Sequence, residues 1–131
     1  MDYIVITGVS TGIGYDAVRY LIDKGYHVFG SIRKQSDADR VKADFGDQFT
    51  PLIFDVTDEN GVKNAAEQVK AAIGDQNLLA LVNNAGISVM GPLMHIPLED
   101  LRLQLEVNVV SVLSRYNQKL WTEKTKEHIL R

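Results

Sequence analysis

Cysteine is missing from the sequence, so disulfide bonds, thiolate catalysis and zinc sites built on sulfur are excluded. An excess of basic charge is missing too: 14 Lys and Arg stand against 17 Asp and Glu, and the basic residues are scattered. Nothing therefore attracts nucleic acid or an anionic membrane. No run approaches the ~20 apolar residues that span a bilayer, and the three histidines lack metal-ligand spacing. We expect a cytoplasmic protein with no nucleic-acid, membrane or metal partner.

The 131 residues, 45% of them hydrophobic, suffice for one domain with one core. Short β-branched runs alternate with longer helical patterns, which is typical of a parallel sheet with crossover helices. Right-handed crossovers then predict an α/β, Rossmann-like, doubly wound sheet with strand order 3-2-1-4. We expect strands at 3–7, 27–32, 51–54 and 78–82, and helices at 13–24, 37–45, 58–73 and from 98 into the tail. Asp37 should cap the second helix, and Asp58 or Thr57 the third. Pro51 should be the first residue of the third strand.

A glycine-rich turn, Thr-Gly-Val-Ser-Thr-Gly-Ile-Gly at residues 7–14, joins the first strand to the first helix. Gly8 suits a tight turn, Gly12 admits a pyrophosphate, and Gly14 allows the helix to pack near the strand. The helix N-terminus offers free N–H groups to the anion. An ordinary strand–helix turn is the alternative, but three glycines between a strand and a helix favour phosphate binding.

Four ordered motifs resemble those of the short-chain dehydrogenase/reductase family. They are Thr-Gly-x-x-x-Gly-Ile-Gly, then Asp55-Val56, Asn-Asn-Ala-Gly at 83–86, and Asn108 within Glu-Val-Asn-Val. The resemblance implies that this is the cofactor-binding half of such an enzyme. It also implies that Asp55 and Val56 contact the adenine, that 83–86 stabilise the sheet, and that Asn108 helps to hold a water in a proton relay. The implied cofactor-binding residues are Gly8, Ser10, Thr11, Gly12, Ile13, Gly14, Arg33, Asp55, Val56, Asn84, Ala85 and Gly86, and the implied catalytic residue is Asn108.

Each motif has a structural alternative. Asp55 could close the turn before the third helix, and Asn83 and Asn84 could be turn residues with left-handed backbone. Asn108 interrupts an apolar helical stripe, so it could be a hydrogen-bonded core amide.

The end of the second strand indicates which dinucleotide is preferred. An acidic residue there would accept the ribose hydroxyls of NAD, but the position holds Ile32, followed by Arg33 and Lys34. A guanidinium can fork onto the 2′-phosphate of NADP. We therefore expect NADP(H) to be preferred and NAD(H) to be the weaker alternative, unless Arg33 and Lys34 belong to a solvated loop.

The resemblance implies a catalytic Ser and a Tyr-x-x-x-Lys pair downstream of Asn108, and no Tyr-x-x-x-Lys follows Asn108 in the 131 residues. Tyr116 and Lys119 are three residues apart, whereas spacing four is needed to project both from one helix face. We interpret Tyr116 as helix packing and Lys119 as solvated. Residues 1–131 then form a single truncated dinucleotide-binding domain, inactive as written, with a tail at 115–131 atypical of the family. A frameshift near Ser114 or a truncated gene copy would explain that tail.

If the sheet stops at its fourth strand, that strand has an unpaired outer edge. Such an edge favours self-association, and we expect marginal stability. A non-catalytic nucleotide-binding module, or a truncated pseudo-enzyme that pairs with a full-length relative, is the alternative to an enzyme portion. A non-functional product that hardly folds is a third hypothesis.

Overall fold

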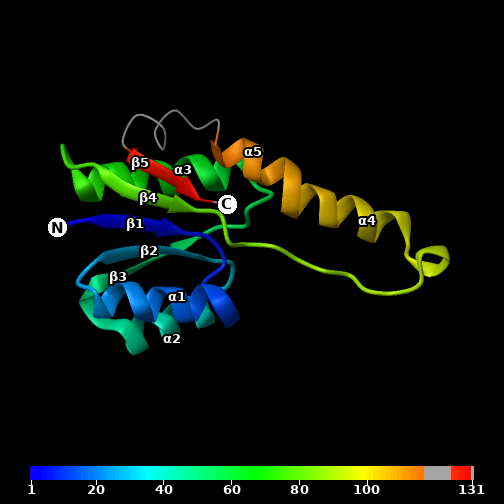
Figure 1. The fold of residues 1–131 in the computed structure, drawn as a ribbon, viewed down its shortest axis with the longest axis horizontal. Helices are drawn as coiled ribbons and strands as arrows, with labels where there is room; N and C mark the ends of the chain where they lie inside the picture. Colours follow the sequence, from blue (N-terminus) through cyan, green and yellow to red (C-terminus); the bar gives the residue numbers. More distant parts are fainter. Residues whose placement is uncertain (117–124, 131) are drawn as a thin grey trace.

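A five-stranded parallel sheet organises the protein (Figure 1). In a computed structural model, the backbone is described for residues 1–116 and 125–130, and the side chains for residues 1–115. The predicted order 3-2-1-4 is confirmed, and a fifth strand extends it to β3-β2-β1-β4-β5. The strands are β1 (Tyr3–Ile6), β2 (His27–Ile32), β3 (Phe49–Ile53), β4 (Leu78–Val82) and β5 (Thr125–Leu130).

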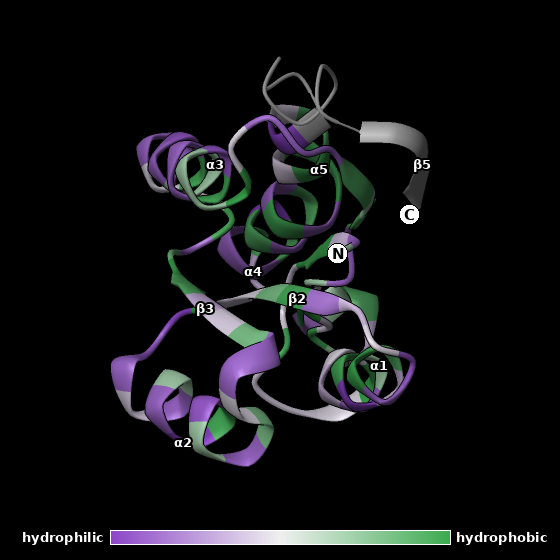
Figure 2. Ribbon diagram, turned by 90° about the vertical axis from the view of Figure 1, so that its left-hand side faces the viewer, coloured by the Kyte–Doolittle hydropathy of each residue, from purple (hydrophilic) through white to green (hydrophobic). Residues whose placement is uncertain are grey.

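Helices lie on both faces of the sheet (Figure 2). The helices α1 (Gly12–Asp23) and α2 (Gln35–Phe45) cover one face, and α3 (Glu59–Ile73) and α5 (Ser111–Tyr116) cover the other. The helix α4 (Leu98–Leu105) runs into α5 through a π-helical turn (Glu106–Val110). Short 3-10 helices occupy Gly46–Gln48 and Leu93–His95. None of the described helices is long and apolar enough to cross a membrane.

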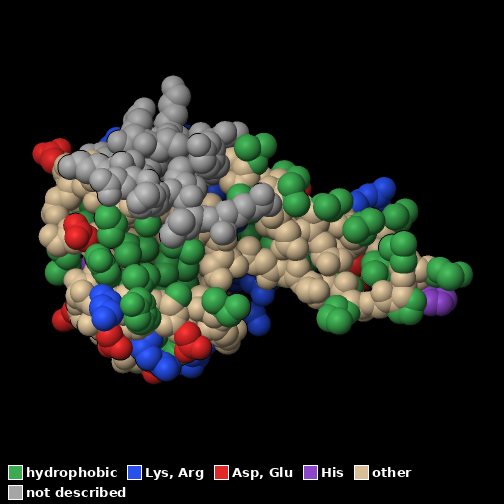
Figure 3. Space-filling model, in the orientation of Figure 1, with side chains coloured by type: hydrophobic (Ala, Val, Ile, Leu, Met, Phe, Trp, Pro, Cys, Tyr) green, Lys and Arg blue, Asp and Glu red, His purple; other side chains and the backbone are tan. Residues whose placement is uncertain are grey.

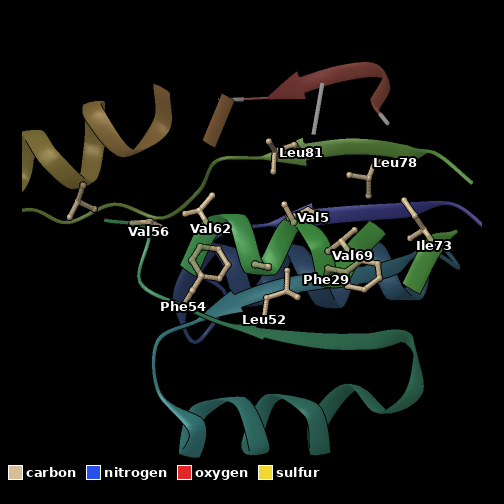
Figure 4. Close-up of a cluster of buried hydrophobic side chains, with 13 residues drawn as sticks. Val5, Phe29, Leu52, Phe54, Val56, Val62, Val69, Ile73, Leu78 and Leu81 are labelled. Atoms are coloured by element: carbon tan, nitrogen blue, oxygen red, sulfur yellow. The ribbon is translucent and has the colours of Figure 1, made fainter. Parts of the chain in front are cut away.

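Two apolar cores form because β1, β2 and β4 are buried on both faces, as central parallel strands are. Val5, Phe29 and Leu52 point toward Val62 and Val69 of α3 in one core (Figure 4). The other core packs the alternate strand residues, such as Ile4, Ile6 and Val28, against α1 and α2. The uninterrupted apolar runs of the sequence therefore have a direct structural cause.

Of the two helix caps predicted from the sequence, one is confirmed and the other is wrong. Asp58 caps α3, because its Oδ1 accepts a hydrogen bond from the Asn60 N–H at 3.1 Å. The prediction that Asp37 caps the second helix was wrong, since α2 begins at Gln35 with Lys34 at the cap position. Asp37 instead lies in the first turn, where its negative charge interacts favourably with the helix dipole.

The third strand also starts earlier than expected. It begins at Phe49, so Pro51 lies within the strand, opposite Gly30 of β2. Proline lacks the N–H that a central strand needs for its hydrogen bonds. It is accommodated because β3 is the edge strand of the sheet.

The expectation that the sheet ends at β4 was wrong. β5 pairs with β4 in parallel, with Ala80 opposite His128 and Val82 opposite Leu130. The charged composition of the tail did not indicate a strand. Helical residues 98–116 act as the crossover that returns the chain to the sheet, where the tail pairs with β4. The outer edge of β4 is therefore occupied, and self-association through that edge loses its structural basis.

Uncovered apolar surface occurs instead on an arm formed by residues 90–113. This arm projects from the body of the molecule and carries many apolar side chains (Figures 1 and 3). The stripe that predicted the last helix faces outward, with Leu98 61% and Leu105 51% exposed. The other exposed apolar side chains of the arm are Met90, Leu93, Met94, Leu101, Leu103, Val109, Val110 and Leu113.

Arg115 is a buried cation in α5, only 1% exposed. Its Nε donates to Asn83 Oδ1 at 2.7 Å, and its Nη1 donates to Ser111 Oγ at 3.1 Å. Its Nη2 has no hydrogen-bond partner among the described residues. Burial lowers the pKa of the guanidinium to about 10, so the group is still charged at neutral pH. A charged group buried with neutral partners costs folding free energy.

We predict that Arg115→Met raises the free energy of unfolding at pH 7 by about 1 kcal/mol or more, because an unbranched apolar side chain of similar length removes the buried charge. Urea unfolding followed by circular dichroism would measure the change. Arg102→Met in the exposed part of α4 is the matched control and should change stability by no more than ~0.5 kcal/mol. A loss of stability in Arg115→Met would show that the guanidinium has a stronger partner than two neutral hydrogen bonds.

Candidate functional site

A cavity of about 400 Å³ lies where β1 to β4 end at their carboxyl edges. Ligands bind at this edge in open parallel sheets. Every predicted cofactor-binding residue except Gly12 lines the cavity: Gly8, Ser10, Thr11, Ile13, Gly14, Arg33, Asp55, Val56, Asn84, Ala85 and Gly86. Folding therefore brings four segments that are far apart in the sequence to one place.

The cavity also includes residues that the sequence analysis missed: Ser31, Ile32, Phe54, Thr57, Ile87, Leu103 and Val107. Most of them are direct neighbours of predicted residues, so extending each predicted segment by one position would have included them. Leu103 and Val107 come from the last helical segment: Val107 lies within the Glu-Val-Asn-Val motif, directly before Asn108, whereas no motif marks Leu103.

The glycine-rich turn uses two of its glycines for backbone conformation. Gly8 has φ +73° and Gly12 has φ +64°, values that residues with a Cβ rarely adopt. Gly8 and Gly14 are also needed for space. A Cβ on Gly8 would lie 2.8 Å from Ala85 Cα, and a Cβ on Gly14 would overlap the Gly8 carbonyl oxygen. Gly12 faces open space, with nothing within 4 Å of an added Cβ.

Asn84 holds this turn against the end of β4. Its Nδ2 donates to the Thr7 carbonyl oxygen at 3.1 Å and to the Gly8 carbonyl oxygen at 2.9 Å. In return, the buried Thr7 Oγ1 accepts hydrogen bonds from the backbone N–H groups of Asn84 and Ala85. No described non-glycine residue has positive φ, so the alternative of a left-handed turn at Asn83 and Asn84 is wrong. The side chain of Asn84 instead joins two strand ends.

Ser31 connects the same turn to β2. Its Oγ accepts the Gly8 N–H at 2.9 Å, and its carbonyl oxygen accepts the Val9 N–H at 3.1 Å. Two residues later, the exposed Arg33 lines the cavity. The residue at the end of β2 is Ile32, which is 2% exposed. Because its side chain is apolar, this position offers no carboxylate to the cavity.

Asp55 both closes a turn and lines the cavity. Its Oδ1 accepts hydrogen bonds from the Thr57 N–H at 2.9 Å and the Thr57 Oγ1 at 2.7 Å. The backbone hydrogen bond from Thr57 is the main cause that lowers the pKa of Asp55; partial burial opposes it, and the Thr57 hydroxyl and the charge of Arg33 reinforce it. The carboxylate is therefore ionised at neutral pH, and its charge interacts with that of Arg33.

Asn108 lies in the π-helical turn, and both ends of its amide bind the backbone of Ile87. Its Oδ1 accepts the Ile87 N–H at 2.9 Å, and its Nδ2 donates to the Ile87 carbonyl oxygen at 2.8 Å. The side chain of Asn108 is therefore a hydrogen-bonded amide, as the structural alternative for this residue predicted. This amide fixes the loop that follows Gly86. Tyr116 and Lys119 lie outside the residues whose side chains are described.

Comparison with known proteins identifies this arrangement. The family model described as short chain dehydrogenase matches residues 2–126. The chain belongs to the short-chain dehydrogenase family. The match continues past Ser114 into the tail that we expected to be atypical, and it includes the start of β5.

Two curated relatives and one solved structure illustrate the likeness. The NADPH-dependent 3-dehydrocapnine reductase of Ornithobacterium rhinotracheale is 42% identical over 121 residues, which are 92% of this chain and 43% of that protein. Dehydrogenase/reductase SDR family member 9 of Bos taurus is 39% identical, over 86% of this chain and 35% of that protein. A 3-ketoacyl-(acyl-carrier-protein) reductase from Brucella melitensis, complexed with NADH, is 26% identical with a TM-score of 0.83, over 89% of this chain and 48% of that one. The chain thus spans less than half the length of these short-chain dehydrogenases.

The residues present fit a nicotinamide dinucleotide. The open space before Gly12 lies at the N-terminus of α1, whose first turn carries no acidic residue that would repel a phosphate. Ser10 and Thr11, which both carry hydroxyl groups, line the cavity.

We predict that Gly14→Ala lowers the free energy of unfolding by about 2 kcal/mol or more, since its Cβ would overlap the Gly8 carbonyl oxygen and lie 2.5 Å from Asn84 Nδ2. Gly12→Ala is the matched control, because it meets open space and should cost only about 1 kcal/mol for its positive φ. Urea unfolding of both variants measures the difference. Equal losses would show that the turn and Asn84 can move apart without penalty.

Proposed function

We propose that this chain binds NADP(H) in the cavity at the carboxyl edge of the sheet, with NAD(H) as a weaker ligand. The observation that carries the proposal is the convergence of all four motif segments on one cavity. In the whole protein, this portion would serve a carbonyl or alcohol oxidoreductase, and we expect it in the cytoplasm. The dinucleotide would supply or accept the hydride there.

The roles of the residues follow from their positions. The N-terminus of α1, with Gly12 and Ile13, suits the pyrophosphate, because the Thr11 side chain does not cap it and the helix dipole favours an anion. Asp55 and Val56 suit the adenine, since they form the cavity wall after β3. Asn84, Ala85 and Gly86 form the wall after β4, with Asn84 placing the turn.

The preference for NADP(H) rests on the end of β2. Ile32 offers no carboxylate to the ribose hydroxyls, and Arg33 places an exposed guanidinium at the cavity. A guanidinium matches the geometry of a phosphate better than that of a hydroxyl pair. The Ornithobacterium relative is named as NADPH-dependent, whereas the Brucella structure contains NADH. The local charge at Arg33 therefore supports the preference more directly than the relatives do.

Hydride transfer should not occur with the 131 residues alone, because no Tyr-x-x-x-Lys follows Asn108 in them, where the resemblance places the catalytic pair. Asn108 is the catalytic residue that the resemblance implies within this chain. Its side chain is bonded to Ile87, so we propose that it contributes by fixing the loop and helix beside the cofactor. Binding of NADP(H) without turnover is the expected behaviour of this chain.

We predict that the chain binds NADPH at least about tenfold more tightly than NADH, and that Arg33→Ala removes most of this difference by weakening NADPH binding. Isothermal titration calorimetry with each dinucleotide gives the four dissociation constants. Lys34→Ala is the matched control, because Lys34 is exposed and adjacent but does not line the cavity. Equal affinity of the parent chain for NADPH and NADH would refute the preference, and absence of binding would refute the proposed function.

A further inference from the structure

Arg40 of α2 reaches the glycine-rich turn from outside the predicted motifs. Its Nη2 donates to the Ser10 carbonyl oxygen at 2.6 Å, across a separation of 30 residues. Asn84 holds the start of the turn, at Thr7 and Gly8, whereas Arg40 holds its middle, at Ser10. The turn is thus fixed from two opposite elements of the fold.

The position of Arg40 is defined by a small polar cluster between α1 and α2. Its guanidinium carbon lies 5.9 Å from the centre of the Tyr15 ring, and the Tyr15 hydroxyl donates to Asp44 Oδ2 at 2.8 Å. Asp37 and Asp44 lie 3.6 Å and 3.9 Å from the two terminal nitrogens of Arg40. These contacts keep the guanidinium beside Ser10 while 45% of its side chain stays exposed.

Most of the hydrogen-bonding capacity of this guanidinium remains available. A guanidinium has five N–H donors, and one is used on Ser10. The two carboxylate distances exceed the range of a hydrogen bond, and exposed ion pairs at such distances contribute little free energy. Asp44 is also engaged by Tyr15, which reduces its hold on Arg40.

The turn itself carries no positive charge, since Val9, Ser10 and Thr11 are uncharged. Arg33 and Ser10 line the same cavity, and Ser31, two residues before Arg33, binds the backbone of Gly8 and Val9. Arg33 and Arg40 therefore place two cations near the Ser10 side of the cavity, from β2 and from α2.

We propose that Arg40 is a second specificity-determining residue for the 2′-phosphate of NADP(H). It supplies the positive charge that the turn lacks, while its bond to Ser10 keeps that charge beside the cavity. This inference rests on the proposed function and adds a residue that no motif marks. The 2′-phosphate carries charge that a 2′-hydroxyl lacks, so the effect of Arg40 is larger for NADP(H) than for NAD(H).

The test is the ratio of NADPH to NADH affinity in Arg40→Met, measured by isothermal titration calorimetry. We expect the dissociation constant for NADPH to rise about fivefold and that for NADH to change less than twofold. The NADPH effect should shrink as salt is raised, because added ions screen the charge. Arg40→Lys keeps the charge and should retain most of the NADPH affinity.

Arg19→Met is the matched control. Arg19 also lies over the Tyr15 ring, at 5.3 Å, and pairs with Asp16, yet it has no hydrogen bond to the turn among the described contacts. This control should bind both dinucleotides like the parent chain.

Equal weakening of NADPH and NADH in Arg40→Met would mean that Arg40 only positions the turn, and would overturn the inference. Unchanged binding of both would overturn it too. The proposed function is judged separately on the parent chain: a parent that binds NADPH tightly while Arg40→Met leaves the ratio intact refutes the role of Arg40 alone. A parent that binds neither dinucleotide refutes both.

Discussion

The amide of Asn84 is the interaction on which the site depends. It donates to two consecutive carbonyl groups, of Thr7 and Gly8, at the point where β1 ends. Without this amide, each of these two partly buried oxygens would lose a hydrogen bond, which costs free energy. An ionised aspartate could not replace it, because a carboxylate has no donor. This one side chain therefore fixes where the glycine-rich turn stands relative to β4.

The glycines are a consequence of that placement. Because the turn is drawn against the end of β4, Gly8 lies against Ala85, and Gly14 lies against Asn84 and the Gly8 carbonyl. Neither position has room for a Cβ. Gly12 differs, since its constraint is backbone conformation and the space before it is open. A packing requirement thus explains Gly8 and Gly14, whereas a backbone requirement explains Gly12.

The sequence allowed the first four strands, the three helices between them and most of the residues that line the cavity to be predicted with few errors. These parts have short-range causes: strands buried on both faces give uninterrupted apolar runs, and the turn needs glycine at fixed positions. The errors occur where long-range context decides. Residues 125–130 look like a polar tail, yet β4 offers them an edge to pair with. The stripe from Leu98 to Val109 looks like a core-facing surface, yet it lies on the projecting arm.

Arg40 and Asn108 show the same limit at the level of single side chains. An arginine on an exposed, highly charged helix is usually solvated, and nothing in its neighbourhood in the sequence reveals a contact with Ser10. For Asn108, the sequence indicated an amide that needs hydrogen bonds, and the structure supplies both from Ile87. What a polar residue requires can thus be inferred from its chemistry, but its partner depends on the tertiary fold.

The charges of the cavity wall also depend on the tertiary fold, which brings together the ends of two strands. The ionised Asp55 after β3 is balanced by Arg33 after β2. The cavity therefore admits a further anion without a net negative field from its own wall.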